Sequence, residues 1–378
     1  MNPFNRLILN GIRVLAVLGF SAPFRAGAEI KYVLHITVDG LRGDLLRGLM
    51  DTRPADYPNF RKLRDEGVST FNARCDYDFS ETLPNHCSAV TGRPVNNPAG
   101  AAGAGHQYNI NSHSPGGHIH KLGAGQYLYK VSTFDTAHDR SLTTALYAGK
   151  TRLNVLVDSY NATNGRPDTT GVDNGRKKID FISVADLSAA PDLLRVKNAL
   201  VADITAAPLS KLRNYSLVHF TDTDTGGPGG GHWVGWGSPA WNGAVKTVDG
   251  YLGGIFTALT ADGTDPEIKG KVAIILTSDH GGGGPAGPGG AFGTSHTDAA
   301  SPLNYTIPLF IWGPGIPAGR DAHTLFKNRF DPADGRPGPT LSTPQPLRNA
   351  DTANIAMGCS VCLQWRAPIS NRNLPPFP

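Results

Sequence analysis

The stretch Ser80-Glu81-Thr82-Leu83-Pro84-Asn85-His86, followed by Cys87-Ser88-Ala89-Val90-Thr91-Gly92, sets the organisation of this chain. It predicts a turn into a helix, because Pro84 suits the first helical turn and the small residues after it can continue one. Such a turn places the Thr82 hydroxyl beside free backbone N–H groups, where a phosphate group binds well. A threonine hydroxyl alone is a poor nucleophile, so this arrangement has chemical meaning only if other residues activate it.

Two apolar runs on either side of this stretch end on carboxylates. Residues 33–38 read Val-Leu-His-Ile-Thr-Val and lead into Asp39-Gly40, and residues 272–278 read Val-Ala-Ile-Ile-Leu-Thr-Ser and lead into Asp279-His280-Gly281. Short runs rich in β-branched residues are typical of buried strands in a parallel sheet. We therefore expect both carboxylates at the edge of such a sheet, where α/β proteins bind their ligands.

Strands and helices alternate along the rest of the chain, without an internal repeat. This alternation predicts an α/β fold with a central, mostly parallel sheet. We expect strands at 31–39, 68–74, 146–148, 215–220, 272–278 and 307–312, and helices ending at Glu66 and covering 134–145, 190–206 and 240–259. The Gly-, Ala- and His-rich tract 96–126 is interpreted mainly as an exposed loop.

The first 28 residues have the pattern of an export signal. Arg6 and Arg13 precede the apolar run 14–20, and Ala26-Gly27-Ala28 offers a small-residue cleavage site. A membrane anchor is the alternative, but the run is shorter than the roughly 20 residues of a spanning helix. We expect a signal peptide at 1–28, a catalytic domain at 29–378, no membrane span after cleavage, and a periplasmic or secreted protein.

Charge and cysteine content limit the partners and the compartment. The formal net charge of +4 includes three arginines in residues 1–28 and no acid there, so the mature chain carries about +1. We therefore predict no binding to nucleic acid or anionic membrane. The four cysteines form two local pairs, Cys75 with Cys87 and Cys359 with Cys362; these are compatible with an oxidising compartment, but sequence alone does not fix their connectivity.

Two further stretches carry side chains that bind metals. One is His219-Phe220-Thr221-Asp222-Thr223-Asp224, followed after a glycine-rich segment by His232; the other, 293–298, contains His296. With the earlier motifs they provide enough nitrogen and oxygen donors for two sites, and zinc fits that chemistry best. Two metal ions several ångströms apart can support an in-line displacement at phosphorus.

Taken together, these motifs resemble the alkaline phosphatase superfamily, and within it the type I phosphodiesterase/nucleotide pyrophosphatase branch. They span most of the mature chain in the family's order. The resemblance implies an alkaline phosphatase-like fold, a central mostly parallel sheet with helices on both faces, and two Zn²⁺ ions. It implies one ligand set of Asp39, Thr82, Asp279 and His280, and a second of Asp224, His232 and His296.

The spacing of the second set departs from the family, which usually has its Asp four residues before the His. Here Asp224 lies eight residues before His232 and Asp222 ten before it, because glycines are inserted. We take Asp224 as the ligand, with Asp222 as the second choice. The resemblance also makes Asn85 the residue that helps to hold a phosphoryl oxygen, a favourable position for a donor at a helix start.

The sequence allows two interpretations of Lys150 and two of a group of three tryptophans. Lys150, which follows an expected strand, would either meet a substrate oxygen or be a solvated lysine. Trp233, Trp236 and Trp241 would form either an apolar wall for a leaving group or part of the helix packing.

The sequence therefore predicts an exported two-metal hydrolase of phosphoric esters that forms a covalent phospho-enzyme on Thr82. Cleavage of phosphodiesters or nucleotide pyrophosphates is the first prediction, with a small phosphate ester or a nucleotide as substrate. A phosphomonoesterase is the alternative, with Arg42, Arg93 or Lys150 balancing the third charged oxygen. An exported metal- or ligand-binding protein without turnover is the alternative from another class. Oligomeric state and physiological substrate do not follow from the sequence.

Overall fold

The computed structural model describes residues 29–120, 128–169, 175–185, 193–284, 292–326, 328–340 and 344–361. The expected signal segment and Cys362 lie outside these residues. Eight strands form one sheet in the order β4-β3-β5-β1-β6-β7-β2-β8. The strands are β1 Tyr32–Val38, β2 Val68–Arg74, β3 Thr144–Ala148, β4 Phe181–Val184, β5 Tyr215–Phe220, β6 Val272–Thr277, β7 Thr306–Trp312 and β8 Arg320–Asp321.

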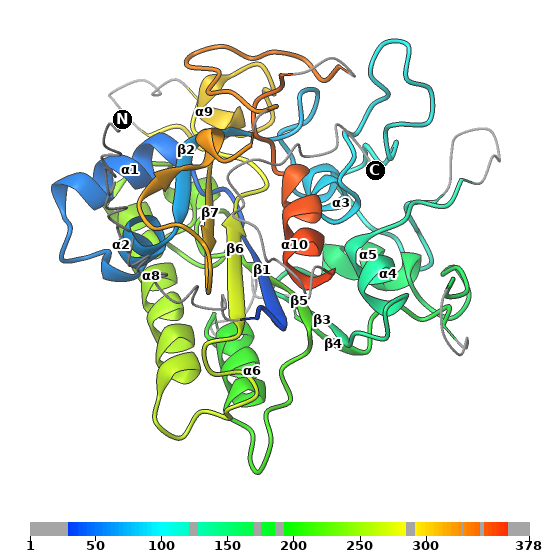
Figure 1. Ribbon diagram of the computed structural model, residues 1–378. Helices are drawn as coiled ribbons and strands as arrows, with labels where there is room; N and C mark the ends of the chain where they lie inside the picture. Colours follow the sequence, from blue (N-terminus) through cyan, green and yellow to red (C-terminus); the bar gives the residue numbers. More distant parts are fainter. Residues whose placement is uncertain are drawn as a thin grey trace, which may run out of the picture.

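Within this sheet, β7 runs antiparallel to its neighbours β6 and β2, and the other pairs are parallel. The prediction of a mostly parallel sheet is therefore confirmed. The carboxyl ends of β1, β3, β5 and β6 meet at one edge because these strands are parallel and adjacent. Figure 1 shows this edge at the top of the sheet, where the loops that follow β1 and β6 approach α3.

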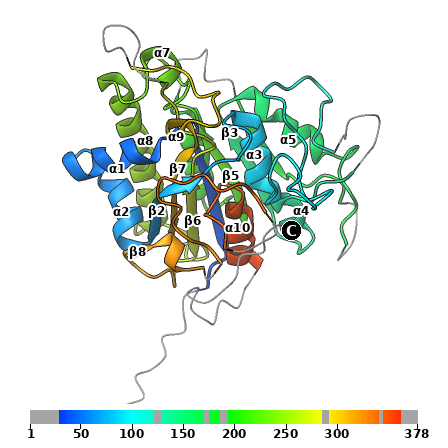
Figure 2. The same cartoon turned by 90° about the horizontal axis from the view of Figure 1, so that it is seen from above.

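Helices cover both faces of the sheet, as predicted (Figures 1 and 2). One face packs against α1 Gly43–Thr52, α2 Pro58–Glu66, α6 Arg195–Ile204 and α8 Pro239–Thr260. The other packs against α3 Thr82–Thr91, α4 Thr133–His138, α5 Asn154–Ser159 and α10 Asp351–Val361. Short segments complete the described elements: η2 Thr151–Leu153, α7 Gly231–Val234, α9 Pro302–Tyr305 and η3 Ala322–Thr324.

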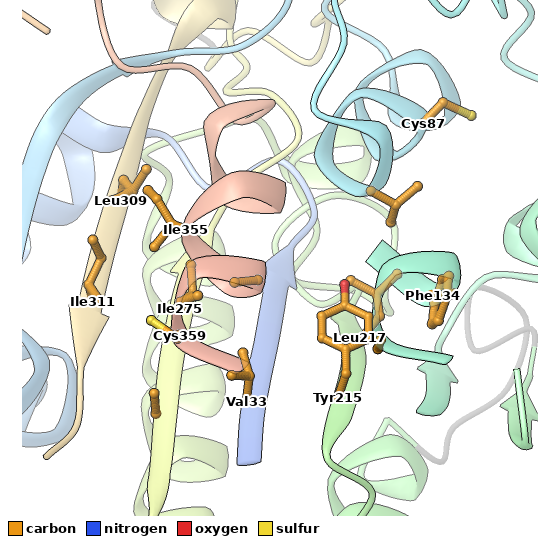
Figure 3. Packing of buried hydrophobic residues seen from close by; sticks show 14 of the residues in the cluster. Val33, Cys87, Phe134, Tyr215, Leu217, Ile275, Leu309, Ile311, Ile355 and Cys359 are labelled. Atoms are coloured by element: carbon orange, nitrogen blue, oxygen red, sulfur yellow. The ribbon is translucent and has the colours of Figure 1, made fainter. Parts of the chain in front are cut away.

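Each central strand buries side chains on both faces, which explains its nearly continuous apolar sequence. In β1, Val33 belongs to the core under α3 and α10, whereas the next residue, Leu34, belongs to the core under α8. Figure 3 shows Ile355 and Cys359 of α10 lying over Val33 and Ile275 of the sheet. Because both faces of these strands are buried, the strands are held in place, and so are the polar side chains that follow their carboxyl ends.

Several expected elements differ from the structure. The helix predicted at 134–145 ends at His138, and β3 already begins at Thr144. The short strand β4 and the helix α10 were not expected from the sequence. The interpretation of residues 96–126 as an exposed loop is wrong for His106, His118 and His120, whose side chains are buried.

The described cysteines do not form the local pair that their spacing allowed. Cys75 and Cys87 are buried free thiols, and Cys359 is buried as well. Cys75 instead donates to backbone carbonyl groups, among them that of Phe79. None of the described helices combines the length and apolar character needed to cross a membrane.

Candidate active site

The turns after β1 and β6 bring two buried aspartates together. Asp39 directly follows β1, and Asp279 follows β6 by two residues. Gly40 takes a left-handed conformation with a φ of 66°, which glycine adopts without strain, and its N–H donates to Asp279 Oδ1 at 3.0 Å. The His280 N–H donates to the same oxygen at 2.9 Å. The backbone therefore orients Asp279 and leaves Oδ2 free for another contact.

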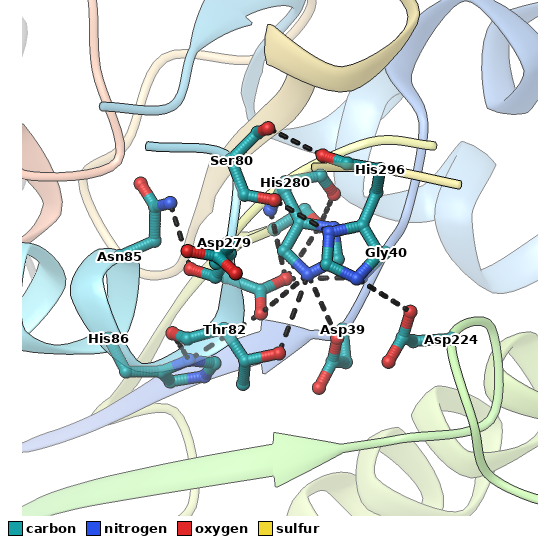
Figure 4. A network of polar contacts seen from close by, with 12 residues as sticks. Asp39, Gly40, Ser80, Thr82, Asn85, His86, Asp224, Asp279, His280 and His296 are labelled. Atoms are coloured by element: carbon teal, nitrogen blue, oxygen red, sulfur yellow. Dashed lines mark hydrogen bonds and ion pairs between the residues drawn. The ribbon is translucent and has the colours of Figure 1, made fainter. Parts of the chain in front are cut away.

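The first cluster is built around His280. Its Nε2 lies 3.4 Å from Asp39 Oδ1, 3.5 Å from Asp279 Oδ2 and 3.5 Å from the Thr82 hydroxyl at the start of α3 (Figure 4). Donors about 2.0 to 2.2 Å from a tetrahedral zinc ion are themselves about 3.4 Å apart. All four predicted residues of the first ligand set are therefore brought together at a spacing that suits one metal ion.

The second cluster lies beside the first. His232 Nε2, on α7, is 3.4 Å from Asp224 Oδ1 and 2.9 Å from His296 Nε2, and His296 Nε2 is 3.9 Å from the same Asp224 oxygen. The His296 ring stacks on His280 with 3.9 Å between centroids. His280 also lies close enough to Asp224 and His296 to form one group of donors with them, so His280 borders both clusters.

Lys150 lies between the two clusters. It follows β3 by two residues and its side chain is 6% exposed. Its Nζ is 2.6 Å from Asp39 Oδ2 and 2.6 Å from Asp224 Oδ2. Burial alone would lower its pKa, but the two carboxylates raise the pKa above the usual lysine value. Lys150 is thus a charged part of the site and not a solvated lysine.

The donor set fits divalent metal ions. Asp39 Oδ1, Asp224 Oδ1 and Asp279 Oδ2 are buried carboxylate oxygens without a hydrogen-bond partner among the described residues. Buried polar atoms of this kind are rare unless an ion or water satisfies them. Burial also lowers the pKa of His280, and that of His296 to about 4, so both imidazoles are neutral at pH 7 and able to bind a cation.

The charges of the two aspartates are strongly coupled. Burial would raise the pKa of Asp39, but the Lys150 ammonium and the nearby imidazoles hold it well below its usual range. Burial and the negative charge of Asp39 together hold the pKa of Asp279 well above its usual range. Two carboxylates this close oppose one another's ionisation, and a cation between them removes that conflict.

Asp222 and Asp224 lie in different surroundings. Asp222 Oδ1 accepts a hydrogen bond of 2.8 Å from the Tyr251 hydroxyl of α8, and burial raises the pKa of Asp222 to about 7. Asp224 faces Lys150 and His232. The glycine-rich insertion therefore folds so that the second aspartate, and not the first, reaches the donor cluster.

The structure gives Asn85 a different role from the one that the resemblance implies. Its Nδ2 donates to the carbonyl oxygens of Phe79 and Glu81, at 2.9 and 3.0 Å, and its Oδ1 accepts from Asp76 N. Both amide protons are thus used to shape the loop before α3. The amide beside the nucleophile is that of Asn111, whose Oδ1 accepts from Leu83 N at 3.0 Å.

Sequence reasoning missed Asn111 because it lies 29 residues after Thr82, in a loop without a periodic pattern. Its Nδ2 group makes no hydrogen bond with the residues that the structure describes, so it can meet an oxygen bound at the N-terminus of α3. Two of the tryptophans, in contrast, shape the backbone of the site. Trp236 Nε1 donates to Gly40 O at 2.7 Å and Trp241 Nε1 to Thr223 O at 2.8 Å, whereas Trp233 is 64% exposed.

Comparison of the sequence with known families gives one match. The family described as Type I phosphodiesterase / nucleotide pyrophosphatase matches residues 33–98 and 107–284, which include most of the site. No curated protein matches the sequence.

Solved structures share the fold at low sequence identity. An inactive variant of murine ectonucleotide pyrophosphatase/phosphodiesterase 5, in complex with AMP, has 13% identity and a TM-score of 0.55, over 88% of this chain and 95% of that one. A putative sulfatase from Bacteroides thetaiotaomicron VPI-5482 has 13% identity and a TM-score of 0.53, over 92% and 74%. The predicted alkaline phosphatase-like fold is confirmed.

Proposed function

Because the chain belongs to the type I phosphodiesterase/nucleotide pyrophosphatase family, within the alkaline phosphatase superfamily, we propose that it is a zinc-dependent hydrolase of phosphoric esters with Thr82 as its nucleophile. One observation carries the proposal. The Thr82 hydroxyl lies at the N-terminus of α3 and 3.5 Å from His280 Nε2, in the same cluster as Asp39 and Asp279. Phosphate groups bind well at helix N-termini, and this one faces a set of metal-binding side chains.

Asp39, Thr82, Asp279 and His280 would hold one zinc ion, and Asp224, His232 and His296 a second. When bound, these ions would lower the pKa of a coordinated hydroxyl or water and stabilise the departing oxygen. The carboxylates set the charge of the site, while the neutral imidazoles provide nitrogen donors without adding charge. The backbone N–H donors at Asp279 hold this carboxylate in place before substrate arrives.

The residues of this chain divide the reaction into two displacements. Thr82 Oγ1 loses its proton and forms a bond with phosphorus as the bond from phosphorus to the departing oxygen breaks, and that oxygen takes up a proton and leaves as the alcohol. Water then attacks the phospho-threonine, which restores the hydroxyl and releases the product. Asn111 Nδ2 and the N–H groups at the start of α3 would hold a non-bridging oxygen during both steps.

Diester cleavage is the main proposal, and nucleotides are among its candidate substrates. A specific observation favours a monoesterase as the second candidate. A cleft of about 620 Å³ adjoins Asn111 and η2; its described lining has no Phe, Tyr or Trp to stack on a base, and it includes the cation Arg152. It is lined by Asn111, Ser112, His113, Pro115, Thr151, Arg152, Asn154, Val157 and Asp158.

Three residues were predicted to balance the third charged oxygen of a monoester: Arg42, Arg93 and Lys150. Of these three, Lys150 lies between the two donor clusters. Arg42 is bound to both oxygens of Asp44 and to Gly282 O, and Arg93 to the carbonyl oxygens of Gly103 and Ala104. Arg152, two residues after Lys150, adds a second positive charge in the adjoining cleft. Arg and Lys side chains are the usual partners of a phosphate dianion.

Hydrolysis assays test the proposal. We expect the protein with added zinc to hydrolyse bis-p-nitrophenyl phosphate and the p-nitrophenyl ester of TMP faster than p-nitrophenyl phosphate, and Thr82→Ala to abolish this. Thr91→Ala, at the other end of the same helix, is the matched control and should keep activity. Faster hydrolysis of the monoester would select the second candidate. Activity that survives in Thr82→Ala would disprove the nucleophile assignment.

Export to the periplasm or the medium remains part of the proposal, supported by the pattern of residues 1–28. N-terminal sequencing of the protein from both cell fractions tests it, and the expected mature start is Glu29. The same Thr82→Ala variant also tests the non-catalytic alternative. A binding protein would retain its ligand affinity in this variant, and the wild type would show no turnover.

A further inference from the structure

The candidate site has an opening to solvent beside one of its predicted ligands, His232 of α7. The His232 side chain is 35% exposed, whereas those of Asp224 and His296 in the same cluster are 1% and 4% exposed. The four residues of the first ligand set are buried as well. Of the seven predicted ligands, His232 is therefore the one that a group projecting from the site into solvent would pass.

The departing group of a substrate would lie at this opening. The Thr82 hydroxyl is 3.5 Å from His280 Nε2, and the His280 ring stacks on His296 (Figure 4). His296 Nε2 is in turn 2.9 Å from His232 Nε2. Thr82 and His232 are thus at opposite ends of this row of side chains. In an in-line displacement the nucleophile and the departing oxygen lie on opposite sides of phosphorus, so the departing oxygen faces the end at His232.

Two exposed aromatic side chains border the opening. Trp233 directly follows His232 and is 64% exposed. Its Nε1 donates to Thr225 O at 3.3 Å, which holds one edge of the ring while most of the indole surface stays open to solvent. Phe292 is 48% exposed and precedes His296 by four residues. Each histidine of the second cluster thus has an exposed aromatic residue close to it in the chain.

Close packing joins the segments that carry the two aromatic residues. A Cβ atom on Gly235 would come within 2.4 Å of Phe292 Cβ, so Phe292 lies directly against the residue after α7. Trp236 N donates to Gly293 O at 3.0 Å beside this contact. Large apolar side chains that are exposed singly need no function. Two of them together at the exposed ligand of a site are typical of a surface that binds the apolar part of a ligand.

This surface lacks cations of its own. Residues 229–245 and 292–305, all of which the structure describes, contain no lysine or arginine. Arg42 is bound to both oxygens of Asp44, and Lys150 is buried between the two donor clusters. A departing pyrophosphate carries several negative charges, and proteins usually hold such groups with Arg or Lys. The surface around α7 therefore suits an uncharged departing group.

We propose that Trp233 and Phe292 bind the departing group of the substrate and that this group is an aromatic or other apolar alcohol without charge. The bond from phosphorus to the oxygen of this alcohol breaks as Thr82 attacks. The alcohol keeps that oxygen and takes up one proton, which balances the proton that Thr82 loses. This inference rests on the proposed function and narrows it, because esters with a charged departing group should be poor substrates.

Two matched esters test the inference. One is methyl p-nitrophenyl phosphate, and the other is its analogue with a carboxylate beside the nitro group of the departing ring. The kcat/KM for both is measured with added zinc for wild type, Trp233→Ala and Phe292→Ala. Leu209→Ala is the matched control, because Leu209 is 67% exposed but precedes β5, at the edge of the sheet opposite to the site.

We expect the wild type to prefer the uncharged ester by at least about 10-fold. Trp233→Ala and Phe292→Ala should each lower kcat/KM for this ester by about 10-fold, because an aromatic contact is lost, and for the carboxylated ester much less. Leu209→Ala should match the wild type with both esters. If the wild type cleaves monoesters only, the same comparison is made with the two corresponding monoesters.

Equal losses for both esters would overturn the inference, because they would mean that the aromatic residues only support the neighbouring histidines. Unchanged kcat/KM in both variants would overturn it too, as would a wild type that prefers the carboxylated ester. Phe292→Ala decides if Trp233→Ala does not fold. A wild type that hydrolyses neither the diesters nor the monoesters would instead overturn the proposed function.

Discussion

Acidification should weaken this fold through His106, a residue of the tract that the sequence presented as exposed. His106 has no accessible surface, its Nε2 lies 3.0 Å from Ser88 Oγ of α3, and its Nδ1 accepts from Tyr108 N at 3.0 Å. Burial lowers the pKa of His106 from 6.5 to about 3. The folded protein therefore keeps the imidazole neutral at pH values where the unfolded chain protonates it.

The sign and size of the effect follow from these two pKa values. Because the pKa is lower in the folded state, the stabilisation is complete above pH 6.5 and is lost as the pH falls. At pH 5 the unfolded chain has bound its proton and the folded chain has not, which lowers the free energy of unfolding by about 2 kcal/mol relative to pH 8. For a chain of this size, that loss lowers Tm by about 3 °C.

Thermal unfolding of wild type and His106→Gln at pH 8 and pH 5 measures this contribution. Chelator is present throughout, so that pH-dependent metal binding does not contribute. We expect the wild-type Tm to fall by about 3 °C more than that of the variant, because other titrating groups affect both proteins equally. Equal decreases would refute the argument and would mean that the tract around His106 does not pack on α3.

Three further predictions concern the site. Asn111→Ala should lower kcat by about 100-fold without changing Tm, because an oxyanion donor is lost. Asn85→Ala should lower Tm, because about 3 kcal/mol of buried hydrogen bonding is lost. Kinetic and melting measurements on both variants check this. Asp224→Asn should weaken Zn²⁺ binding by at least about 10-fold and Asp222→Asn should not, measured by chelator competition. If the enzyme is a monoesterase, Arg152→Ala should slow hydrolysis of p-nitrophenyl phosphate about 100-fold and of its methyl diester much less; equal losses would exclude that role.

Much of the fold was predictable because it rests on local patterns. The strands β2 and β5 have the predicted bounds, β6 and β7 differ from them by one residue at one end, and β1 is one residue shorter than predicted at each end. These strands are buried on both faces, so their composition is unambiguous. The sequence could place Asp39, Asp224 and Asp279 near one another for the same reason: each lies within four residues after a strand, and parallel strands bring their carboxyl ends to one edge.

The parts that were missed depend on contacts distant in sequence. His106 and Asn111 lie in a loop whose polar, glycine-rich composition gives no sign of burial, and their partners are on α3. The same applies to Asn85, whose position at the helix start suits an oxyanion donor. Its actual role depends on the folded loop at residues 76–81, whose groups it binds. A helix N-terminus thus predicts where an anion binds, but not which side chain accompanies it.

The balance of charge shows that Lys150 alone suits a diester and leaves a monoester unbalanced. Asp39, Asp224 and Asp279 bring three negative charges when ionised and Lys150 one positive charge. Two divalent cations and an ionised Thr82 would leave one positive charge, which the single charge of a diester neutralises. A monoester dianion would leave one negative charge, which is costly in a buried site. The cation that could balance it is Arg152, whose side chain has no ion pair with the described residues. Whether this guanidinium meets the substrate therefore decides the specificity.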